Sequence, residues 1–387
     1  MWRSIASNAL TFFIVGLFLL AGVVIWGSES YEAEGPLEQA VCLQVPRGAS
    51  MWSVSENLGE QGAVSSPTLF RMGVQYADIA DDLKAGSFLI PERASMAQIA
   101  ALVTGDGVST CGTEVIYRVG VNSARVEVRE LDPTLGQYVE LVRFDPVEEE
   151  APEAYQAVKT QSDTQYRVAL AEGVTSWSIV QALNAIDTLE GAVEEIPDEG
   201  WLAPDSYSFA PGDTVAGMLA QMRARQERIL AEEWAARADD LPYETPEEAL
   251  IMASIVEKET GEAEERPQVA SVFVNRLRQG WRLQTDPTVI YGVTEGRGVL
   301  GRGLRQSELD AETPWNTYRI DGLPQTPIAN PGRAAIRAAL NPDTTEYFFF
   351  VADGTGGHAF SQTLDEHNRN VARWREIEAQ QEAASDG

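Results

Sequence analysis

The stretch of sequence from Thr245 to Gly292 reads TPEEALIMASIVEKETGEAEERPQVASVFVNRLRQGWRLQTDPTVIYG. Its first four residues, Thr245 to Glu248, combine a hydroxyl cap, a proline at the first helical position and a glutamate three residues after the cap. This combination is typical of a helix start. We therefore predict a helix that begins at Thr245.

Near the end of this helix, two glutamates compete for a functional role. Glu259 extends an apolar stripe that helical spacing draws through Met252 and Val256, so we expect its carboxyl group to face inward. A carboxyl group held against apolar surface shifts toward its neutral form, which a general acid near neutral pH requires. Glu257, on another face with Ala253, stays a second candidate. Either residue could instead be a solvated glutamate at a helix end.

A second helix is predicted from Pro267 to the closing Gly280. The polar residues Gln284, Thr285 and Asp286 follow on a loop. Their donors and acceptors suit sugar hydroxyl groups. Asp286 stands before a proline, however, so its role could be limited to capping another short helix.

At these residues the sequence resembles a known family. The segments ASIVEKET, ASVFVNRL and RLQTDPTVIYG are similar to those of the endolytic murein transglycosylase family, the YceG-like proteins. Several long motifs in order make a stronger match than one short pattern. The resemblance continues through Gly200 to Tyr207, Thr313 to Tyr318, Gly322 to Pro324, Ile328 to Gly332 and Phe349 to Phe360.

The resemblance implies an enzyme that cuts peptidoglycan glycan strands internally. In the family the glutamate of the KET triplet is catalytic, which places the role on Glu259 and not on Glu257. We expect no cofactor and no metal, because His358 and His367 lack a nearby cysteine or a carboxylate at ligand spacing. The substrate-binding candidates are Gln284, Thr285, Asp286, Asn316, Tyr318 and Arg282.

The chemistry that the resemblance implies needs one carboxyl group. Neutral Glu259 would protonate the oxygen that links N-acetylmuramic acid to N-acetylglucosamine, and would then act as a base. The C6 hydroxyl of the muramic residue would attack its own anomeric carbon and leave a 1,6-anhydro end. Two alternatives stay open: a hydrolytic glycosidase with Asp286 as second carboxylate, and a non-enzymatic, membrane-anchored wall-binding protein.

The amino-terminal segment is apolar. Ser4 to Ser28 contains no charged residue, with Arg3 before it and Glu29 after it, and is long enough to cross a bilayer. The shorter apolar core and small-x-small site of a cleaved signal peptide are not evident. We therefore predict a cytoplasmic stub over 1–6 and a transmembrane helix over 7–27, which makes a single-pass inner-membrane protein with a periplasmic catalytic domain.

The charge of the chain excludes one class of partner. With 29 basic and 59 acidic residues the formal charge is −30, which argues against a nucleic-acid partner. Between Arg266 and Arg305, however, seven arginines stand against two acidic residues. A positive cleft there would suit a substrate that bears carboxylates, and ion pairs with the acidic remainder are the alternative. The resemblance implies nascent peptidoglycan strands and peptidoglycan synthases as partners.

Cys42 and Cys111 are the two cysteines of the chain. They bracket one compact unit, and outside the cytoplasm such a pair is a disulfide candidate. Two free buried thiols are the alternative.

A motif, G-x-[ST]-x-W-S-[VI]-x-x-x-L, occurs twice without a gap, from Gly48 to Leu58 and from Gly173 to Leu183. Each copy follows a short apolar run, so each predicts a strand, a turn and a capped helix. The first copy lies in a segment, 40–112, that resembles the LysM-like module of the family, and LysM modules bind glycans that contain N-acetylglucosamine. Trp52 and Trp177 are interpreted as packing residues, since large aromatic side chains dominate core burial.

The predicted fold class is α+β. It comprises the transmembrane helix, the LysM-like α/β module, a β-rich insertion with an acidic linker over 113–165, and a C-terminal α+β lytic transglycosylase domain over 166–377. Within that domain we expect one long helix from Thr214 to Ala238 and a buried strand from Glu346 to Val351. Residues 378–387 are predicted to form a flexible tail.

Overall fold

The computed structural model describes residues 2–46, 48–105, 110–146, 148–159, 161 and 164–385, without the side chains of 2–10, 12 and 382–385. Its internal contacts divide the chain into two compact units. Unit 1 comprises Met1–Val115, Glu127–Phe144 and Glu150–Gln165. Unit 2 comprises Ile116–Val126, Asp145–Glu149 and Tyr166–Gly387.

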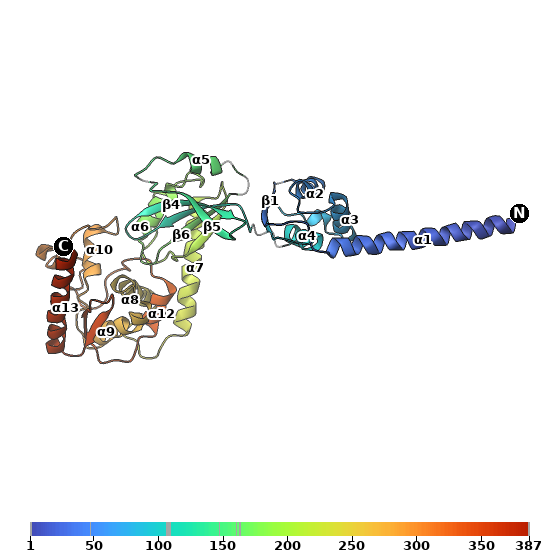
Figure 1. The fold of residues 1–387 in the computed structure, drawn as a ribbon. Coiled ribbons are helices and arrows are strands. Elements are labelled where there is room, and N and C mark those ends of the chain that lie inside the picture. Colours follow the sequence, from blue (N-terminus) through green and yellow to red (C-terminus); the bar gives the residue numbers. More distant parts are fainter. Residues whose placement is uncertain are drawn as a thin grey trace. The chain divides into compact units, whose positions relative to one another are not determined.

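Unit 1 begins with one continuous helix, α1, Trp2–Glu32 (Figure 1). Its stretch Phe13–Glu32 has a hydropathy of 1.8, and none of it is buried. By length and composition α1 is compatible with a single-pass anchor, and also with a signal sequence. Residue 1 of the predicted stub lies outside the described residues.

The segment 40–112, predicted to be LysM-like, forms a two-stranded antiparallel ladder covered by short helices. Its core buries Leu43, Phe70, Phe88 and Ile99 completely or almost so. The helices begin where hydroxyl side chains cap them, as at Ser50. The elements are β1 (Val41–Val45), α2 (Met51–Glu60), α3 (Pro67–Tyr76), the 3-10 turn η1 (Ala80–Asp82), β2 (Gly86–Ile90) and α4 (Met96–Thr104).

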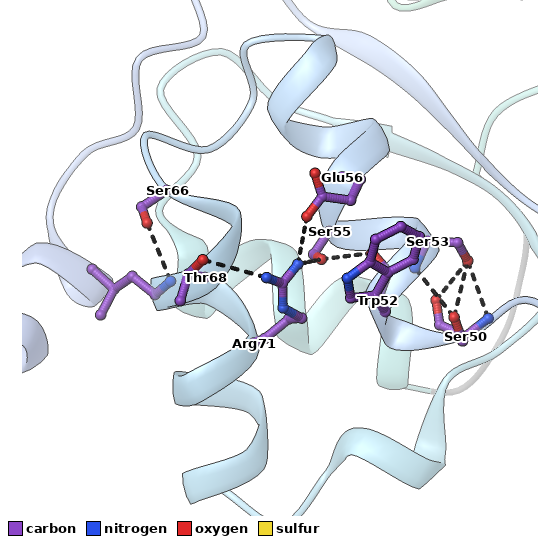
Figure 2. Close-up of polar contacts among 9 residues, drawn as sticks. Ser50, Trp52, Ser53, Ser55, Glu56, Ser66, Thr68 and Arg71 are labelled. Atoms are coloured by element: carbon purple, nitrogen blue, oxygen red, sulfur yellow. Dashed lines mark hydrogen bonds and ion pairs between the residues drawn. The ribbon is translucent and has the colours of Figure 1, made fainter.

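The interpretation of Trp52 as a packing residue is wrong. Its side chain on α2 is 63% exposed. Arg71 on α3 instead bridges the two helices, because it donates hydrogen bonds of 2.7 Å to Ser55 and to Glu56 (Figure 2). The α2–α3 pair is therefore joined by a polar contact beside the indole, which stays open to solvent.

Cys42 on β1 and Cys111 are joined as a disulfide, with Cα atoms 5.8 Å apart. This separation lies within the usual range for disulfides. Closure of a loop of 69 residues stabilises a fold by about 4 kcal/mol in the chain-entropy model. The bonded state of the pair in the mature protein stays a prediction.

A five-stranded sheet has the order β5-β4-β3-β6-β7. Three of its strands are those predicted within 113–165, and α5 (Glu153–Lys159) follows them. β6 pairs antiparallel with β7, with Val168 opposite Tyr207. The strands are β3 (Thr113–Val119), β4 (Ala124–Asp132), β5 (Gln137–Phe144), β6 (Gln165–Leu170) and β7 (Ser206–Phe209).

The helices of unit 2 surround α8, Pro246–Glu259 (Figure 1). The predicted start is confirmed, because Thr245 and Glu248 form a reciprocal capping box. Helix α8 packs against α9 and α12, and it buries Met252, Ile255 and Val256 fully. The other helices are α6 (Ser176–Asn184), α7 (Val215–Ala235), the 3-10 turn η2 (Ala263–Glu265), α9 (Arg266–Arg278), α10 (Asp286–Thr294), α11 (Gln306–Leu309), α12 (Arg333–Leu340) and α13 (Leu364–Ser385).

One prediction about the carboxyl-terminal part needs correction. The expected buried strand is β8, Phe349–Ala352, which pairs in a two-stranded ladder with β9, His358–Ser361, and is only partly buried. The tail predicted over 378–387 belongs to helix α13 as far as Ser385, and its flexibility stays a prediction. Residues 386–387 lie outside the described part.

Candidate active site

The side chain of Glu259 lies at the carboxyl end of α8. Its carboxyl group accepts a short hydrogen bond from the Thr285 hydroxyl. Burial raises the pKa of Glu259, the Thr285 bond lowers it, and the nearby charge of Asp286 raises it again. His358 and Arg276 lie near enough to favour the charged form, but the net shift is upward. Glu259 therefore has the environment of a general acid.

The Thr285 hydroxyl is held by its backbone and by two other threonines. The preceding residue, Gln284, has a φ of 51°, a left-handed conformation that is rare outside glycine. The Thr285 N–H donates to the Thr317 hydroxyl at 3.0 Å. The Thr288 hydroxyl lies 2.7 Å from the Thr285 carbonyl oxygen and 2.8 Å from the Thr317 hydroxyl. This network fixes the donor that faces Glu259.

Asp286 is the first residue of α10, whose cap is Thr285, so the interpretation of Asp286 as a cap is wrong. Its carboxylate is exposed and accepts a hydrogen bond of 2.7 Å from the Tyr318 hydroxyl. An acidic side chain is favoured in the first turn by the helix dipole. Asp286 and Tyr318 thus place a polar pair next to Glu259.

Glu257 points to a different part of unit 2. Its side chain is 4% exposed. Its carboxylate accepts a hydrogen bond of 2.9 Å from the Gly332 N–H and one of 3.4 Å from the Arg266 guanidinium. Burial raises its pKa, whereas the Gly332 bond lowers it. Lys258, between the two glutamates, donates to the Gly173 carbonyl at 3.4 Å. The side chains of Glu257 and Glu259 therefore lie on different faces of α8, as expected from helical spacing.

Asn316 does not lie open to a ligand. It is fully buried, and its amide donates to three backbone carbonyls, including that of Ala311 at 2.6 Å. Its side-chain oxygen accepts from the Tyr318 N–H at 3.0 Å. We therefore correct its predicted role from substrate binding to support of the loop that carries Tyr318.

The arginine-rich segment is largely engaged within the protein. Arg282 pairs with Asp321 at 2.9 Å and donates to the Tyr318 carbonyl at 3.0 Å. Arg276 is buried and donates to backbone carbonyls, among them that of Phe348 at 2.8 Å. These contacts favour the ion-pair alternative over an open positive cleft here. Ion pairs form at Arg266, Arg278, Arg282, Arg297 and Arg302.

Both histidines have contacts other than metal ligation. The His358 ring lies 2.8 Å from a Glu265 carboxylate oxygen, and His367 stacks on Phe349 with ring centroids 5.2 Å apart. Within the described ranges, no group of three or more His, Cys, Asp or Glu is arranged to hold a metal ion.

The carboxyl group of Glu199, whose pKa is raised like those of Glu257 and Glu259, was missed by the sequence analysis. The Glu199 carboxylate accepts hydrogen bonds from the Ser176 N–H at 2.8 Å, the Asn330 amide at 3.1 Å and the Tyr291 hydroxyl at 3.3 Å. Burial raises its pKa to about 7. Glu199 directly precedes Gly200 to Tyr207, a segment that resembles the family, and this position could have marked it as a candidate residue. Thr288, Thr317 and Arg276 were missed because their contacts come from distant parts of the chain.

Comparison with known proteins identifies the family. The model of the YceG-like family matches residues 146–373, more than half of the sequence. The chain belongs to the YceG-like family. The endolytic murein transglycosylase of Bacillus subtilis is 26% identical over 355 residues, which cover 91% of this chain and 89% of the relative.

Two further relatives of this YceG-like protein differ in coverage. The endolytic murein transglycosylase of Streptococcus pneumoniae serotype 2 is 26% identical over 339 residues, which cover 86% of this chain and 58% of the relative. The crystal structure of a YceG-like protein from Listeria monocytogenes aligns with a TM-score of 0.46 and 24% identity, and covers 86% of this chain and 99% of that one.

Proposed function

We propose that this YceG-like protein is a lytic transglycosylase that cuts peptidoglycan glycan strands internally, with Glu259 as catalytic acid and base. The relatives named endolytic murein transglycosylase support the substrate class. The observation that carries the proposal is the carboxyl group of Glu259, whose pKa burial raises and which faces Thr285 beside the exposed Asp286.

The first step is proton transfer from neutral Glu259 to the glycosidic oxygen between N-acetylmuramic acid and N-acetylglucosamine. The bond from that oxygen to the muramic C1 breaks, and an oxocarbenium-like state forms. The Thr285 hydroxyl stabilises the carboxylate left on Glu259, because a hydrogen bond to the charged form favours it. The charge of Asp286 would stabilise the positive sugar ring.

The second step returns the proton. The Glu259 carboxylate takes the proton of the muramic C6 hydroxyl while that oxygen bonds to C1. The products are a 1,6-anhydro end and a new hydroxyl on N-acetylglucosamine, so neither water nor a second nucleophilic carboxylate takes part. We propose that Gln284, Asp286 and Tyr318 contact the sugar. In support, Asp286 and Tyr318 are hydrogen-bonded to each other and interact electrostatically with Glu259, and Gln284 directly precedes Thr285.

We further propose that α1 anchors the protein in the inner membrane, with residues 1–6 in the cytoplasm and the catalytic domain in the periplasm. The uncharged, unburied stretch of α1 supports this topology. Cleavage would then occur near the membrane, on nascent strands beside peptidoglycan synthases, and would terminate strand elongation. The LysM-like module of unit 1 would contact the same glycan.

A hydrolytic glycosidase is the second candidate, because the exposed Asp286 lies beside Glu259 and could activate water. Digestion of purified glycan strands by the full chain in detergent separates the two functions. A lytic product is lighter by one water than the hydrolytic product, and mass spectrometry of the product ends reads that difference. Anhydro ends support the proposal, and hydrated ends contradict it.

A further inference from the structure

Three adjoining cavities of unit 2 have no aspartate or glutamate among the described residues that line them. Their volumes are about 330, 420 and 320 Å³. The first two share Val121 and Val299, and the last two share Arg118 and Arg125. We call this surface the basic groove, because its charged lining residues are Lys258, Arg302, Arg118 and Arg125.

The absence of acids from this lining is notable in a chain with 59 acidic residues and a formal charge of −30. A concave surface lined by one sign of charge concentrates ligands of the other sign. The neutral lining includes Ile290 and the exposed Val299, which is 61% exposed. The groove therefore suits an extended ligand with negative charges and some apolar surface.

Two residues that line the basic groove are chain neighbours of residues of the proposed catalytic site. Lys258, which lines it, directly precedes Glu259 in the chain. Pro287 also lines it and directly follows Asp286 on α10. A group attached to the sugar at Glu259 would therefore enter the groove at its Lys258 end.

The ammonium group of Lys258 has hydrogen-bond donors that the described contacts do not use. It carries three N–H groups, and its described hydrogen bond is the long one of 3.4 Å to the Gly173 carbonyl. Burial lowers the pKa of Lys258, and the nearby charges of Glu257 and Glu199 act in the opposite direction. No carboxylate of the described residues pairs with it at ion-pair distance. Arg302, by contrast, is already paired with Glu308 at 2.5 Å. Lys258 is thus a cation of the groove that no carboxylate among the described residues pairs with, and it directly precedes Glu259 in the chain.

We propose that the basic groove binds the peptide stem of the muramic residue, with Lys258 contacting a stem carboxylate. The inference rests on the proposed function, since it requires the muramic sugar to lie at Glu259. Peptide stems are short, carry free carboxylates and also have small apolar side chains, which matches the charge and apolar lining of the groove. We assign the carboxylate contact to Lys258 because arginines of the arginine-rich segment already form ion pairs within the protein.

Peptide binding can be measured without turnover. The full chain carrying Glu259→Gln, in detergent, is titrated calorimetrically with a free stem pentapeptide and with its fully amidated counterpart. We expect the carboxylate peptide to bind about tenfold more tightly, as charge-assisted hydrogen bonds allow. Lys258→Met should abolish most of this preference, and Lys258→Arg should retain it. Lys84→Met, the same change in unit 1, is the matched control.

Equal affinity for the two peptides, or a full preference retained by Lys258→Met, would overturn the inference. Should Lys258→Met fail to fold by thermal melting, Val299→Asp decides, because a new negative charge at the exposed rim should cut the preference at least about threefold. An unchanged preference in Val299→Asp then overturns it. Lytic turnover retained by Glu259→Gln would instead contradict the proposed function, whatever the peptide titration shows.

Discussion

Glu257 and Glu259 lie two residues apart on α8, and burial raises the pKa of both, yet they face different regions. The region around Glu257 supplies the Gly332 N–H and the Arg266 guanidinium, so this carboxylate is bound within the protein. The region around Glu259 supplies the hydroxyl of Thr285. Burial alone therefore does not make a carboxyl group a catalytic acid; what its oxygens already bind decides between the two.

The largest expected effect comes from Glu259→Gln. The amide keeps the size and the acceptor for Thr285 but cannot deliver a proton, so lytic turnover should fall by about 10² to 10⁴. Folding should be unaffected. Anhydro-end formation and thermal melting, measured on the same preparation, check both expectations, and turnover within about tenfold of the wild type would remove Glu259 from the acid role.

Glu199 extends the comparison, because burial raises the pKa of its carboxyl group as it does for Glu257 and Glu259. Its pKa is about 7 in the folded chain, against an ordinary value near 4.5, so the folded state binds its proton more tightly. The stability that Glu199 contributes should therefore be fully present below about pH 4.5 and be lost as pH rises through about 7, by up to about 3 kcal/mol.

Glu199→Gln should remove that pH dependence, because its amide has no proton to lose. Melting curves of wild type and variant at pH 5 and pH 8 give the difference. We expect the variant to gain stability relative to the wild type at pH 8. Identical pH dependence of the two proteins would show that the Glu199 pKa is ordinary.

Glu257→Gln should cost stability and spare chemistry. The change removes the negative charge that faces Arg266 and leaves the buried guanidinium with a weaker partner, at a cost of about 1 to 3 kcal/mol. Lytic turnover at a temperature where the variant is folded should stay within about tenfold of wild type. Denaturant unfolding measures the first effect, and a stability equal to wild type would show that the Arg266 contact contributes nothing.

Two smaller changes should shift the pH profile in opposite directions. Thr285→Val removes a hydrogen bond that lowers the pKa of Glu259, so the acid stays protonated to higher pH. Asp286→Asn removes a charge that raises that pKa, so the acid is lost at lower pH. The basic limb of the kcat/KM profile should move to higher pH for Thr285→Val and to lower pH for Asp286→Asn. Shifts of the same sign would contradict this electrostatic assignment.

The sequence predicted local structure well where short-range chemistry decides it. The caps at Thr245 and Thr214 place the starts of α8 and α7 correctly. Both copies of the repeat form a turn with a glycine φ of 78°, at Gly48 and at Gly173, and a capped helix follows each. Such features depend on residues within one turn of each other.

The surroundings of those elements could not be predicted in the same way. Trp52 and Trp177 occupy the same position of the repeat, but one is 63% exposed and the other lines the basic groove. Asn316 was selected as a ligand residue, and carbonyl groups of its own loop occupy its amide. Contacts between side chains that are far apart in the sequence depend on tertiary packing, and the periodicity of the sequence does not predict them.

The two glutamates on α8 can be compared in one assay. Wild type, Glu259→Gln and Glu257→Gln are incubated with purified glycan strands, and the initial rate of 1,6-anhydro end formation is read by mass spectrometry. Anhydro ends should form with wild type and Glu257→Gln and fall by about 10² or more with Glu259→Gln. Loss of these ends with Glu257→Gln, together with their persistence with Glu259→Gln, would contradict the assignment of the acid.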